Sequence, residues 1–280
     1  MTPSSALTFR TIADVGVALA ASALTEAFRD YFVPMRPTAD SLLNTARVDD
    51  VDFDQSYVVF DGDCVLGCAL LARRDGAARI AGMGIVPEGR SRGAGRALVM
   101  RLLEDARARG DSALNLEVIE QNERALRLYE ALGFERIRRL SGFEGHFTNT
   151  RAASDDARQR IEILEPRFLW TSEAPDDLPW QCSARSAQRL VPPFAALRRG
   201  PSAMVISDPT MPRIAIRAIR TSSELRKRGH ARALLQGAAA LFPDKDWSVN
   251  VLCPEELANL FLTAGLQRSK LTQIQMRVRL

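Results

Sequence analysis

The chain has 280 residues, of which 46% are hydrophobic and 26% are charged, as in ordinary globular domains with apolar cores. Its formal net charge is only +4, and acidic and basic residues are interleaved, so the sequence does not favour a nucleic-acid partner. Two histidines and four cysteines disfavour a metal site, a serine–histidine–aspartate triad and a disulfide framework.

No stretch approaches the roughly 18 apolar residues that a membrane-spanning helix needs. The apolar segment 15–24 does not resemble a signal peptide, because Asp14 precedes it and charged residues follow at helical spacing. We therefore expect an amphipathic first helix in a cytoplasmic protein without a membrane partner. The length suggests one large or two ordinary domains.

The first half of the chain predicts a mixed α/β layer fold. Alternating and helical hydrophobic patterns, with turn and cap residues at their ends, indicate six strands and four helices. In chain order these are a strand at 7–12, helices at 13–28 and 38–47, strands at 56–60, 64–73 and 78–86, a helix at 96–109, a strand at 113–119, a helix at 122–132 and a strand at 134–140.

A polar stretch at 148–160 is typical of a linker, so we expect domains at 1–150 and 151–280. After residue 203 the order of strands and helices repeats that of the first half. Gly229 follows Gly93 by 136 residues and Gly265 follows Gly133 by 132, which indicates a diverged internal duplication.

The turn at 86–96 joins a strand to a long helix. Its glycines allow the backbone to approach a ligand, and the helix N-terminus adds partial positive charge. Such a turn suits a pyrophosphate. It is not a Walker loop, since no Gly-Lys-Ser/Thr follows, and alone it is equally consistent with a plain strand-to-helix turn.

A second candidate element spans 116–134, where a strand runs into a helix at Asn122. Ala125, Leu128 and Leu132 share one helical face, and Tyr129 lies beside them, so its hydroxyl is expected to point at the sheet. Without a ligand, Tyr129 is simply a core aromatic residue and Asn122 a helix cap.

Together the two elements resemble the GNAT superfamily of N-acetyltransferases over residues 7–148. The family's pyrophosphate loop, Arg/Gln-x-x-Gly-x-Gly/Ala, is matched at Arg90, Gly93 and Gly95. Its second signature is an Asn seven residues before a Tyr, followed by Gly-Phe, and it is matched at Asn122, Tyr129, Gly133 and Phe134. The resemblance predicts an α/β GNAT fold with a mixed α+β sheet, here duplicated.

The resemblance also implies that acetyl-CoA is a co-substrate, and the small number of histidines gives no reason to expect a metal. The loop that would bind its pyrophosphate comprises Arg90, Ser91, Arg92, Gly93, Ala94, Gly95 and Arg96. The pantetheine arm would pair with the strand end at Met83, Gly84 and Ile85. Asn122 would contact that arm, and Tyr129 would lie near the thioester sulfur.

In the implied reaction, an amine attacks the thioester, and Tyr129 acts as general acid toward the leaving thiolate. Glu117 is the candidate base. It lies five residues before Asn122, as does the glutamate of the ribosomal-protein alanine N-acetyltransferase type. Glu120 is the reserve candidate. Glu117 is equally consistent with a solvated side chain near a strand end.

The second half departs from the family pattern. Phe261 stands where the first copy has Tyr129, and the region of Cys253 to Glu255 has no asparagine to match Asn122. Phenylalanine cannot donate a proton, so we expect a degenerate GNAT-like domain at 151–280.

The apolar loop at 31–35 is the candidate acceptor site, with Phe32 and Met35 as substrate-binding residues, although a loop that only covers the core has the same composition. The expected partner is a small-molecule or peptide amine, and a homodimer stays open. The alternative to an enzyme is a non-catalytic acyl-CoA-binding sensor or scaffold.

Overall fold

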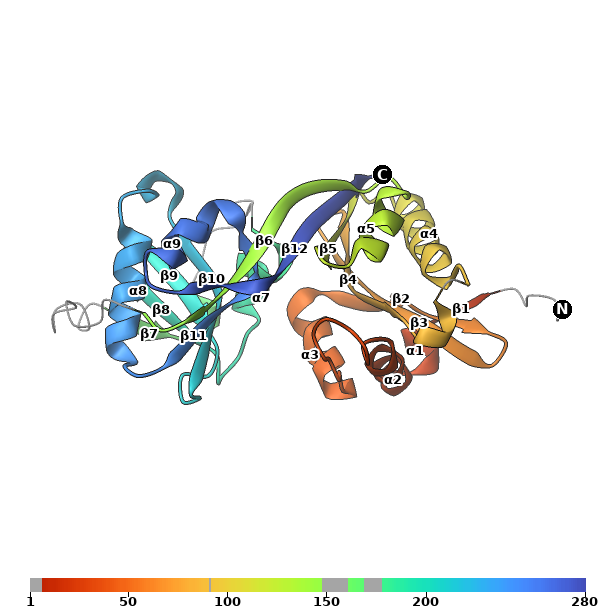
Figure 1. Ribbon diagram of the computed structural model, residues 1–280, viewed down its shortest axis with the longest axis horizontal. Coiled ribbons are helices and arrows are strands. Elements are labelled where there is room, and N and C mark those ends of the chain that lie inside the picture. The colour runs from red at the N-terminus through yellow and green to blue at the C-terminus, as the bar shows by residue number, and fades with distance from the viewer. Residues whose placement is uncertain (1–6, 91, 148–160, 169–177) are drawn as a thin grey trace. The chain divides into compact units, whose positions relative to one another are not determined.

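The computed structural model describes residues 7–90, 92–147, 161–168 and 178–280, which form two compact units (Figure 1). Unit 1 holds the described residues up to Val118, together with Glu123–Ile137 and Met276–Leu280. Unit 2 holds Ile119–Asn122 and the described part of Arg138–Gln275. The expected linker at 148–160 lies outside the described residues.

The division differs from the expected domains at 1–150 and 151–280. Two long strands, β6 (Glu135–Gly145) and β12 (Gln267–Arg279), each contribute residues to both units. The last residues of the chain therefore belong to unit 1, where the Leu280 amide donates to the Ser112 carbonyl at 3.2 Å.

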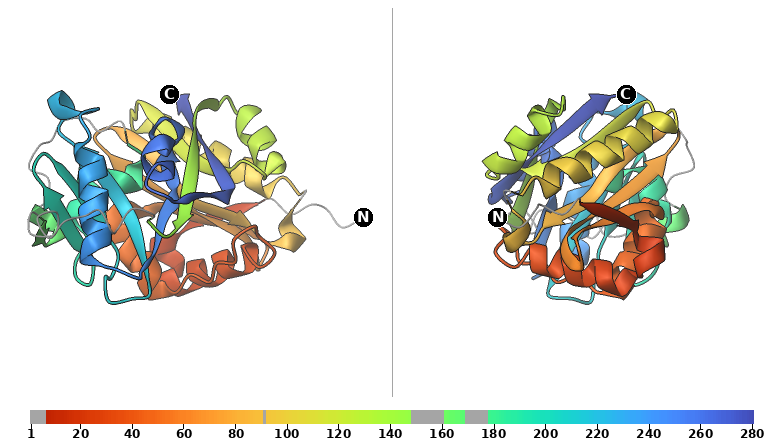
Figure 2. Two further views of the ribbon diagram at one scale, coloured as in Figure 1. Left: turned by 60° about the vertical axis from the view of Figure 1, so that its left-hand side comes forward. Right: turned by 90° about the vertical axis from the view of Figure 1, so that its right-hand side faces the viewer.

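Unit 1 has a mixed sheet covered by helices on both faces (Figures 1 and 2). Its strands follow the order β1-β2-β3-β4-β5-β12. The helices α1, α2 and α3 cover one face, and α4 and α5 cover the other. The bounds are β1 Thr8–Thr11, α1 Ile12–Val15, α2 Val17–Ala27, α3 Ala39–Asp49, β2 Val51–Asp61, β3 Cys64–Arg74, β4 Ala77–Ile85, α4 Ala94–Ala108, β5 Ala113–Ile119 and α5 Glu123–Glu130.

Local sequence explains most of these boundaries. Thr38 caps α3 through a reciprocal pair of hydrogen bonds with Ser41, a capping box. The helix expected at 13–28 is instead two helices, because Gly16 adopts a φ of 89° between them. A positive φ is accessible to glycine without a Cβ clash, so the break occurs there.

Unit 2 contains the strand order β12-β6-β11-β10-β9-β8-β7. The helix α8 packs against β8, β9 and β10, while a short 3-10 turn, η4, also contacts β10 (Figure 2, left). The bounds are β7 Glu162–Leu164, η4 Trp180–Cys182, α7 Ala184–Gln188, β8 Ala195–Arg199, β9 Ser202–Ile206, β10 Arg213–Thr221, α8 His230–Leu241, β11 Asp246–Pro254 and α9 Ala258–Leu262. The largest members of its core are Trp247, Phe143 and Phe261.

The same local geometry recurs in the two units 136 residues apart. The strands β4 and β10 have matching bounds at this offset, and so do the 3-10 turns that follow them, Pro87–Gly89 and Ser223–Leu225. Gly93 then caps α4 with φ 79° and ψ −6°, and Gly229 caps α8 with φ 84° and ψ −2°. The 3-10 turns and the helix caps of the two loops therefore have the same geometry.

Each unit also contains a pair of parallel strands that separate after a short stretch of pairing. In unit 1, β4 and β5 pair only from Ala78 opposite Leu114 to Ile80 opposite Leu116. In unit 2, β10 and β11 pair from Arg213 opposite Asp246 to Ile216 opposite Val249. Beyond these points the strands continue without pairing to each other.

Candidate active site

The turn between β4 and α4 leaves the N-terminus of the helix open. Gly93 has a left-handed conformation that favours glycine, and no described side chain caps α4. A Cβ atom built on Gly93 would meet no described atom within 4 Å, so the turn faces open space. The first amides of α4 are thus available to an anion, as the sequence predicts. Ser91 lies outside the described residues.

The arginines of this turn fall into two groups. Arg90 donates from Nε to the Ile85 carbonyl at 3.2 Å and from its Nη2 to the Ala27 carbonyl at 3.0 Å. It therefore ties the end of α2 to the end of β4. Arg92 and Arg96 are exposed, and Arg92 lies 3.4 Å from the Asp61 carboxylate. Only these two present guanidinium groups toward solvent at the helix N-terminus.

The strand end at residues 83–85 lies between the turn and the first helical layer. Gly84 is buried, and a Cβ atom there would be 2.6 Å from the Ala27 Cβ atom. The absence of a side chain thus allows α2 to approach β4 closely. Since β4 pairs with β5 only as far as Ile80, backbone groups after this point are not used by β5. A pantetheine arm that pairs with β4 like an added strand, as the sequence predicts, would need unpaired backbone groups of this kind.

Tyr129 lies on the face of α5 that packs into unit 1. Its side chain is buried, its hydroxyl is 3.9 Å from the Met83 sulfur, and its ring meets Phe134 edge-on at 5.6 Å. Burial raises the pKa of the Tyr129 hydroxyl, and nearby Tyr31 raises it further. The hydroxyl is therefore a protonated donor over the whole neutral range.

Glu117 is not a free carboxylate. Its Oε2 atom lies 2.8 Å from the Arg79 Nε atom and 2.7 Å from an Arg79 terminal nitrogen, and each side chain is only 4% exposed. The alternative of a solvated glutamate is therefore wrong. An amine that used Glu117 as a base would have to approach a carboxylate already held by a guanidinium.

Sequence reasoning missed Arg79, but strand register identifies it. Arg79 of β4 is opposite Asn115 of β5, and Glu117 comes two residues later on the same face of the sheet. Tyr31, the first residue of the predicted acceptor loop, follows α2 and lies near Tyr129, a proximity that the sequence did not predict. Its ring packs against those of Phe28 at 5.1 Å and Phe32 at 5.4 Å.

Two predicted residues fall in unit 2. Glu120, the reserve base, accepts hydrogen bonds from Arg139 at 2.7 Å and from the Thr272 hydroxyl at 2.5 Å. The Asn122 amide donates to the Ile119 carbonyl at 2.9 Å, which forms the turn before α5. Glu120 is thus held in an ion pair.

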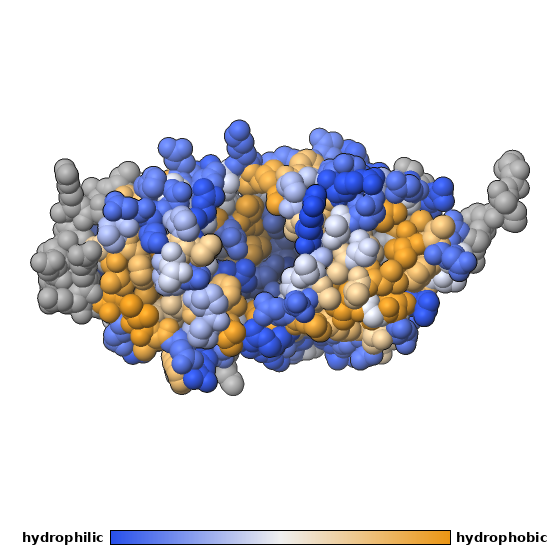
Figure 3. All heavy atoms as spheres, turned by 90° about the horizontal axis from the view of Figure 1, so that it is seen from below, coloured by the Kyte–Doolittle hydropathy of each residue, from blue (hydrophilic) through white to orange (hydrophobic). Residues whose placement is uncertain are grey.

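The predicted acceptor loop is exposed. Phe32, Val33 and Met35 have exposed fractions of 48%, 42% and 41%. The face of unit 1 formed by α1, α2 and α3, viewed from below in Figure 3, carries apolar surface bordered by charged residues. Exposed aromatic and aliphatic side chains beside Tyr31 would suit an acceptor with an apolar part.

Solved structures with similar folds cover nearly the whole chain. A GCN5-related N-acetyltransferase from Sphaerobacter thermophilus has a TM-score of 0.66 at 14% identity, with 98% of this chain and 95% of that chain covered. A putative acetyltransferase from Pyrococcus horikoshii has a TM-score of 0.67 at 15% identity, with 100% and 91% covered. A tandem GNAT protein from the clavulanic acid biosynthesis pathway has a TM-score of 0.59 at 18% identity, with 98% of each chain covered. The chain therefore has the GNAT fold, with a mixed α/β sheet, as predicted.

The family comparison agrees with this fold. Residues 21–134 match the family described as "Acetyltransferase (GNAT) family". This segment matches a GNAT acetyltransferase domain, and the resemblance seen in the sequence is confirmed. A search of curated proteins found no match.

None of the helices in the described ranges combines the length and apolar character needed to cross a bilayer. Within the same ranges, no three histidine, cysteine, aspartate or glutamate side chains gather closely enough to hold a metal ion.

Proposed function

We propose that unit 1 is an N-acyltransferase that moves the acetyl group of acetyl-CoA to an amine. The observation that carries this proposal is the open N-terminus of α4 behind Gly93, next to a strand end whose Met83 side chain contacts the Tyr129 hydroxyl. An anion site and a proton donor would thus lie along one strand end. The cytoplasm remains the expected location.

The loop suits the pyrophosphate of CoA. The backbone amides of Ala94, Gly95 and Arg96 begin α4, where four amides have no intrahelical acceptor. Arg92 and Arg96 would supply the charged contacts. Arg90 would act indirectly, by fixing the strand end to α2. The pantetheine arm would follow residues 83–85, whose backbone is not used by β5.

The reaction would proceed by direct attack. The amine nitrogen bonds to the acetyl carbon, the carbon–sulfur bond breaks, and the electron pair leaves on the thiolate. Tyr129 would donate a hydrogen bond and then a proton to that sulfur, because burial keeps its hydroxyl protonated. The amine loses one proton, for which Glu117 remains the candidate acceptor.

The ion pair with Arg79 favours the rival function, an acyl-CoA sensor without catalysis. A binding protein has no need of a free base, and Arg79 holds the predicted base in a buried pair. Turnover with any amine would remove this rival.

We infer that unit 2 is a diverged second copy. The offset of 136 residues is kept by β10, the 3-10 turn and Gly229, and the Arg226 Nε donates to the Thr221 carbonyl as Arg90 does to that of Ile85. Phe261 stands where unit 1 has Tyr129. It is buried and stacks on Phe143, so unit 2 lacks the proton donor at this place.

The direct test is release of free CoA from acetyl-CoA in the presence of amines. The amine panel should include polyamines, amino acids, aminoglycosides and peptides with free N-termini. The proposal expects amine-dependent release, with the acetylated product seen by mass spectrometry. Acetyl-CoA binding without turnover on any amine would favour the sensor instead.

A further inference from the structure

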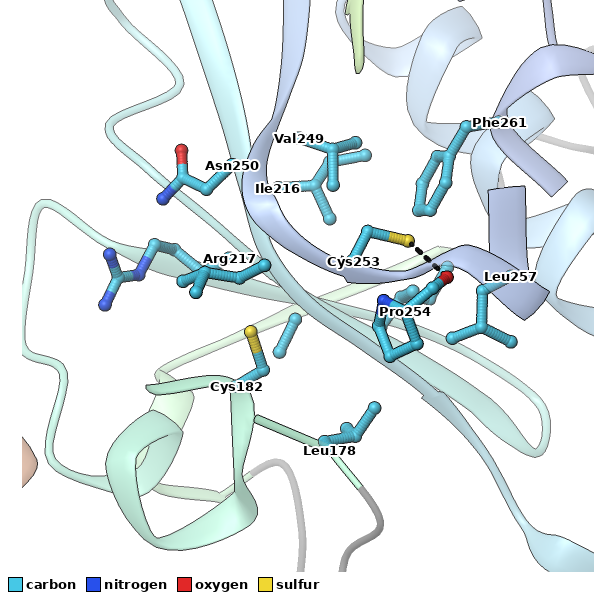
Figure 4. Close-up of a pocket in the computed structure, with 13 residues that line it drawn as sticks. Leu178, Cys182, Ile216, Arg217, Val249, Asn250, Cys253, Pro254, Leu257 and Phe261 are labelled. Atoms are coloured by element: carbon cyan, nitrogen blue, oxygen red, sulfur yellow. Dashed lines mark hydrogen bonds between the residues drawn. The ribbon is translucent and has the colours of Figure 1, made fainter. Parts of the chain in front are cut away.

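Unit 2 contains a pocket where β10 and β11 separate. It holds about 390 Å³ of space, open solvent included, and it is lined mostly by apolar side chains. Figure 4 shows its two ends. Arg217 and Asn250 lie on one side, and Pro254, Leu257 and Phe261 lie on the other. The pocket thus has a polar end and an apolar end.

The polar end has an equivalent position in unit 1. The last paired residues are Ile80 opposite Leu116 in unit 1, and Ile216 opposite Val249 in unit 2. One step further, unit 1 has Ala81 and Glu117, whereas unit 2 has Arg217 and Asn250. The charged group directly after the last paired residues is therefore a carboxylate in unit 1 and a guanidinium in unit 2.

A β-bulge places Arg217 at this step. The register of β9 against β10 shifts between Ile216 and Ala218, so Arg217 is the extra residue. Bulges re-aim side chains and are frequent next to binding sites. The Arg217 Nε atom is buried and has no hydrogen-bond partner among the described residues. A buried donor without an acceptor is costly, and a ligand carboxylate would satisfy it.

The acidic residues near the pocket do not oppose an anion strongly, because each already has a basic partner. Glu255 accepts hydrogen bonds from Arg268 and Ser141, and its pKa is lowered, with the Arg268 hydrogen bond the largest cause. Glu256 lies 3.4 Å from Arg138. Burial raises the pKa of the Cys253 thiol to about 12, so this lining residue is neutral at ordinary pH.

The apolar end is formed by the chain itself. Leu178, which precedes η4, and Cys182, the last residue of η4, line the pocket, and η4 packs against β10. These residues take up space beside a strand end whose counterpart in unit 1 we assign to the pantetheine arm. The apolar lining at this end suits the alkyl part of a ligand.

We propose that this pocket binds a small carboxylate with an apolar tail. The carboxylate accepts hydrogen bonds from Arg217 and Asn250, and the tail lies against Leu257, Pro254 and Phe261. Unit 1 would thus bind an amine substrate, and unit 2 would bind a carboxylic acid in its ionised form.

The test uses sodium octanoate as the probe and the full-length chain. Calorimetry compares the wild type with Arg217→Met, which keeps the chain length and removes the charge. Arg213→Met is the matched control, because Arg213 is an exposed arginine on the same strand outside the pocket. Octanol and octylammonium keep the tail and change the head group. Circular dichroism checks that each variant folds.

The proposal predicts saturable binding of octanoate to the wild type. It also predicts a loss of about ten-fold or more in affinity for Arg217→Met and a change of less than about two-fold for Arg213→Met. Asn250→Ala, a second variant for the same head group, should also weaken octanoate. Octanol should bind the wild type and Arg217→Met alike, and octylammonium should bind the wild type more weakly than octanoate does.

Three results would overturn the proposal. These are no octanoate binding up to millimolar concentration, equal affinity in Arg217→Met, and displacement of octanoate by saturating acetyl-CoA. The last result would make the pocket a second cofactor site. None of them depends on turnover by unit 1, so the two proposals fail separately.

Discussion

Arg79 and Glu117 form a buried salt bridge of 2.7 Å across β4 and β5 in unit 1. Two charges in such a place stabilise the fold only together, because either one alone would stay buried without its partner. The pair thus bears on stability and on the identity of the catalytic base.

Arg79→Met should lower the free energy of unfolding by about 3–5 kcal/mol, because it leaves the Glu117 carboxylate buried and unpaired. Urea denaturation measures this. The exposed pair Arg127 and Glu123, at 3.0 Å, is the control, and Arg127→Met should change stability by less than about 1 kcal/mol. The double variant Arg79→Met/Glu117→Met tests the coupling. If its loss of unfolding free energy equalled the sum of the losses in the two single variants, the residues would not be coupled.

Glu117→Gln separates structure from catalysis. If Glu117 is the base, turnover falls by about 10²-fold or more while the affinity for acetyl-CoA is kept. Unchanged turnover in a folded Glu117→Gln variant would leave Glu117 a structural partner of Arg79.

Tyr129→Phe should lower turnover by about 10²-fold without changing the affinity for acetyl-CoA, since only the hydroxyl is lost. Because burial raises the Tyr129 pKa above its ordinary value of about 10, turnover should not fall below that pH through loss of the tyrosine proton. Equal turnover of wild type and Tyr129→Phe from pH 6 to 10 would remove the general-acid role.

The same raised pKa affects stability. The folded state holds the Tyr129 proton more tightly than the unfolded state, so this contribution is complete below pH about 10 and declines as the pH rises further. The wild type should therefore lose more stability than Tyr129→Phe above that pH. Unfolding curves between pH 9 and 11 measure the difference.

Gly84→Ala should destabilise unit 1 by about 1–3 kcal/mol, because its Cβ atom would be 2.6 Å from the Ala27 Cβ atom. Gly82→Ala is the control. A Cβ atom there would meet only a Leu70 methyl group at 3.6 Å, and Gly82 does not have a positive φ. Thermal unfolding compares the two variants. Equal melting temperatures would show that α2 adjusts to the extra methyl group.

Arg90 and Arg96 should have different effects. Arg90→Ala loses two bonds to backbone carbonyls and should cost about 1–3 kcal/mol of stability. Arg96→Ala should leave stability unchanged and weaken acetyl-CoA binding several-fold, with a smaller difference at high salt. If Arg90→Ala instead weakened acetyl-CoA binding and left stability unchanged, Arg90 would bind the cofactor directly.

The parts of the site that could be predicted from sequence depend on local rules. The Gly-rich turn 86–96 follows a β pattern, and Gly93 stands directly before a helical one, so the sequence at this place predicts a helix N-terminus without a side-chain cap. The Thr38 cap is equally local, since its partner Ser41 is three residues away.

The parts that sequence missed depend on pairing between distant segments. Arg79 meets Glu117 only because β4 and β5 adopt one particular register. Met276–Leu280 belong to unit 1 because β12 returns there from unit 2, which no composition shift indicates. β7 and β8 lie between residues 161 and 199, for which the sequence analysis predicts no strand.

The most direct test of the central claim is the binding of acetyl-CoA, measured by calorimetry on the wild type, Gly93→Trp and Gly229→Trp. Both glycines cap helices in the same left-handed conformation and face open space, so the two substitutions impose matched strain. We predict that Gly93→Trp abolishes binding and that Gly229→Trp leaves it unchanged. Binding that survives in Gly93→Trp and disappears in Gly229→Trp would contradict the account, because the cofactor site would then lie in unit 2.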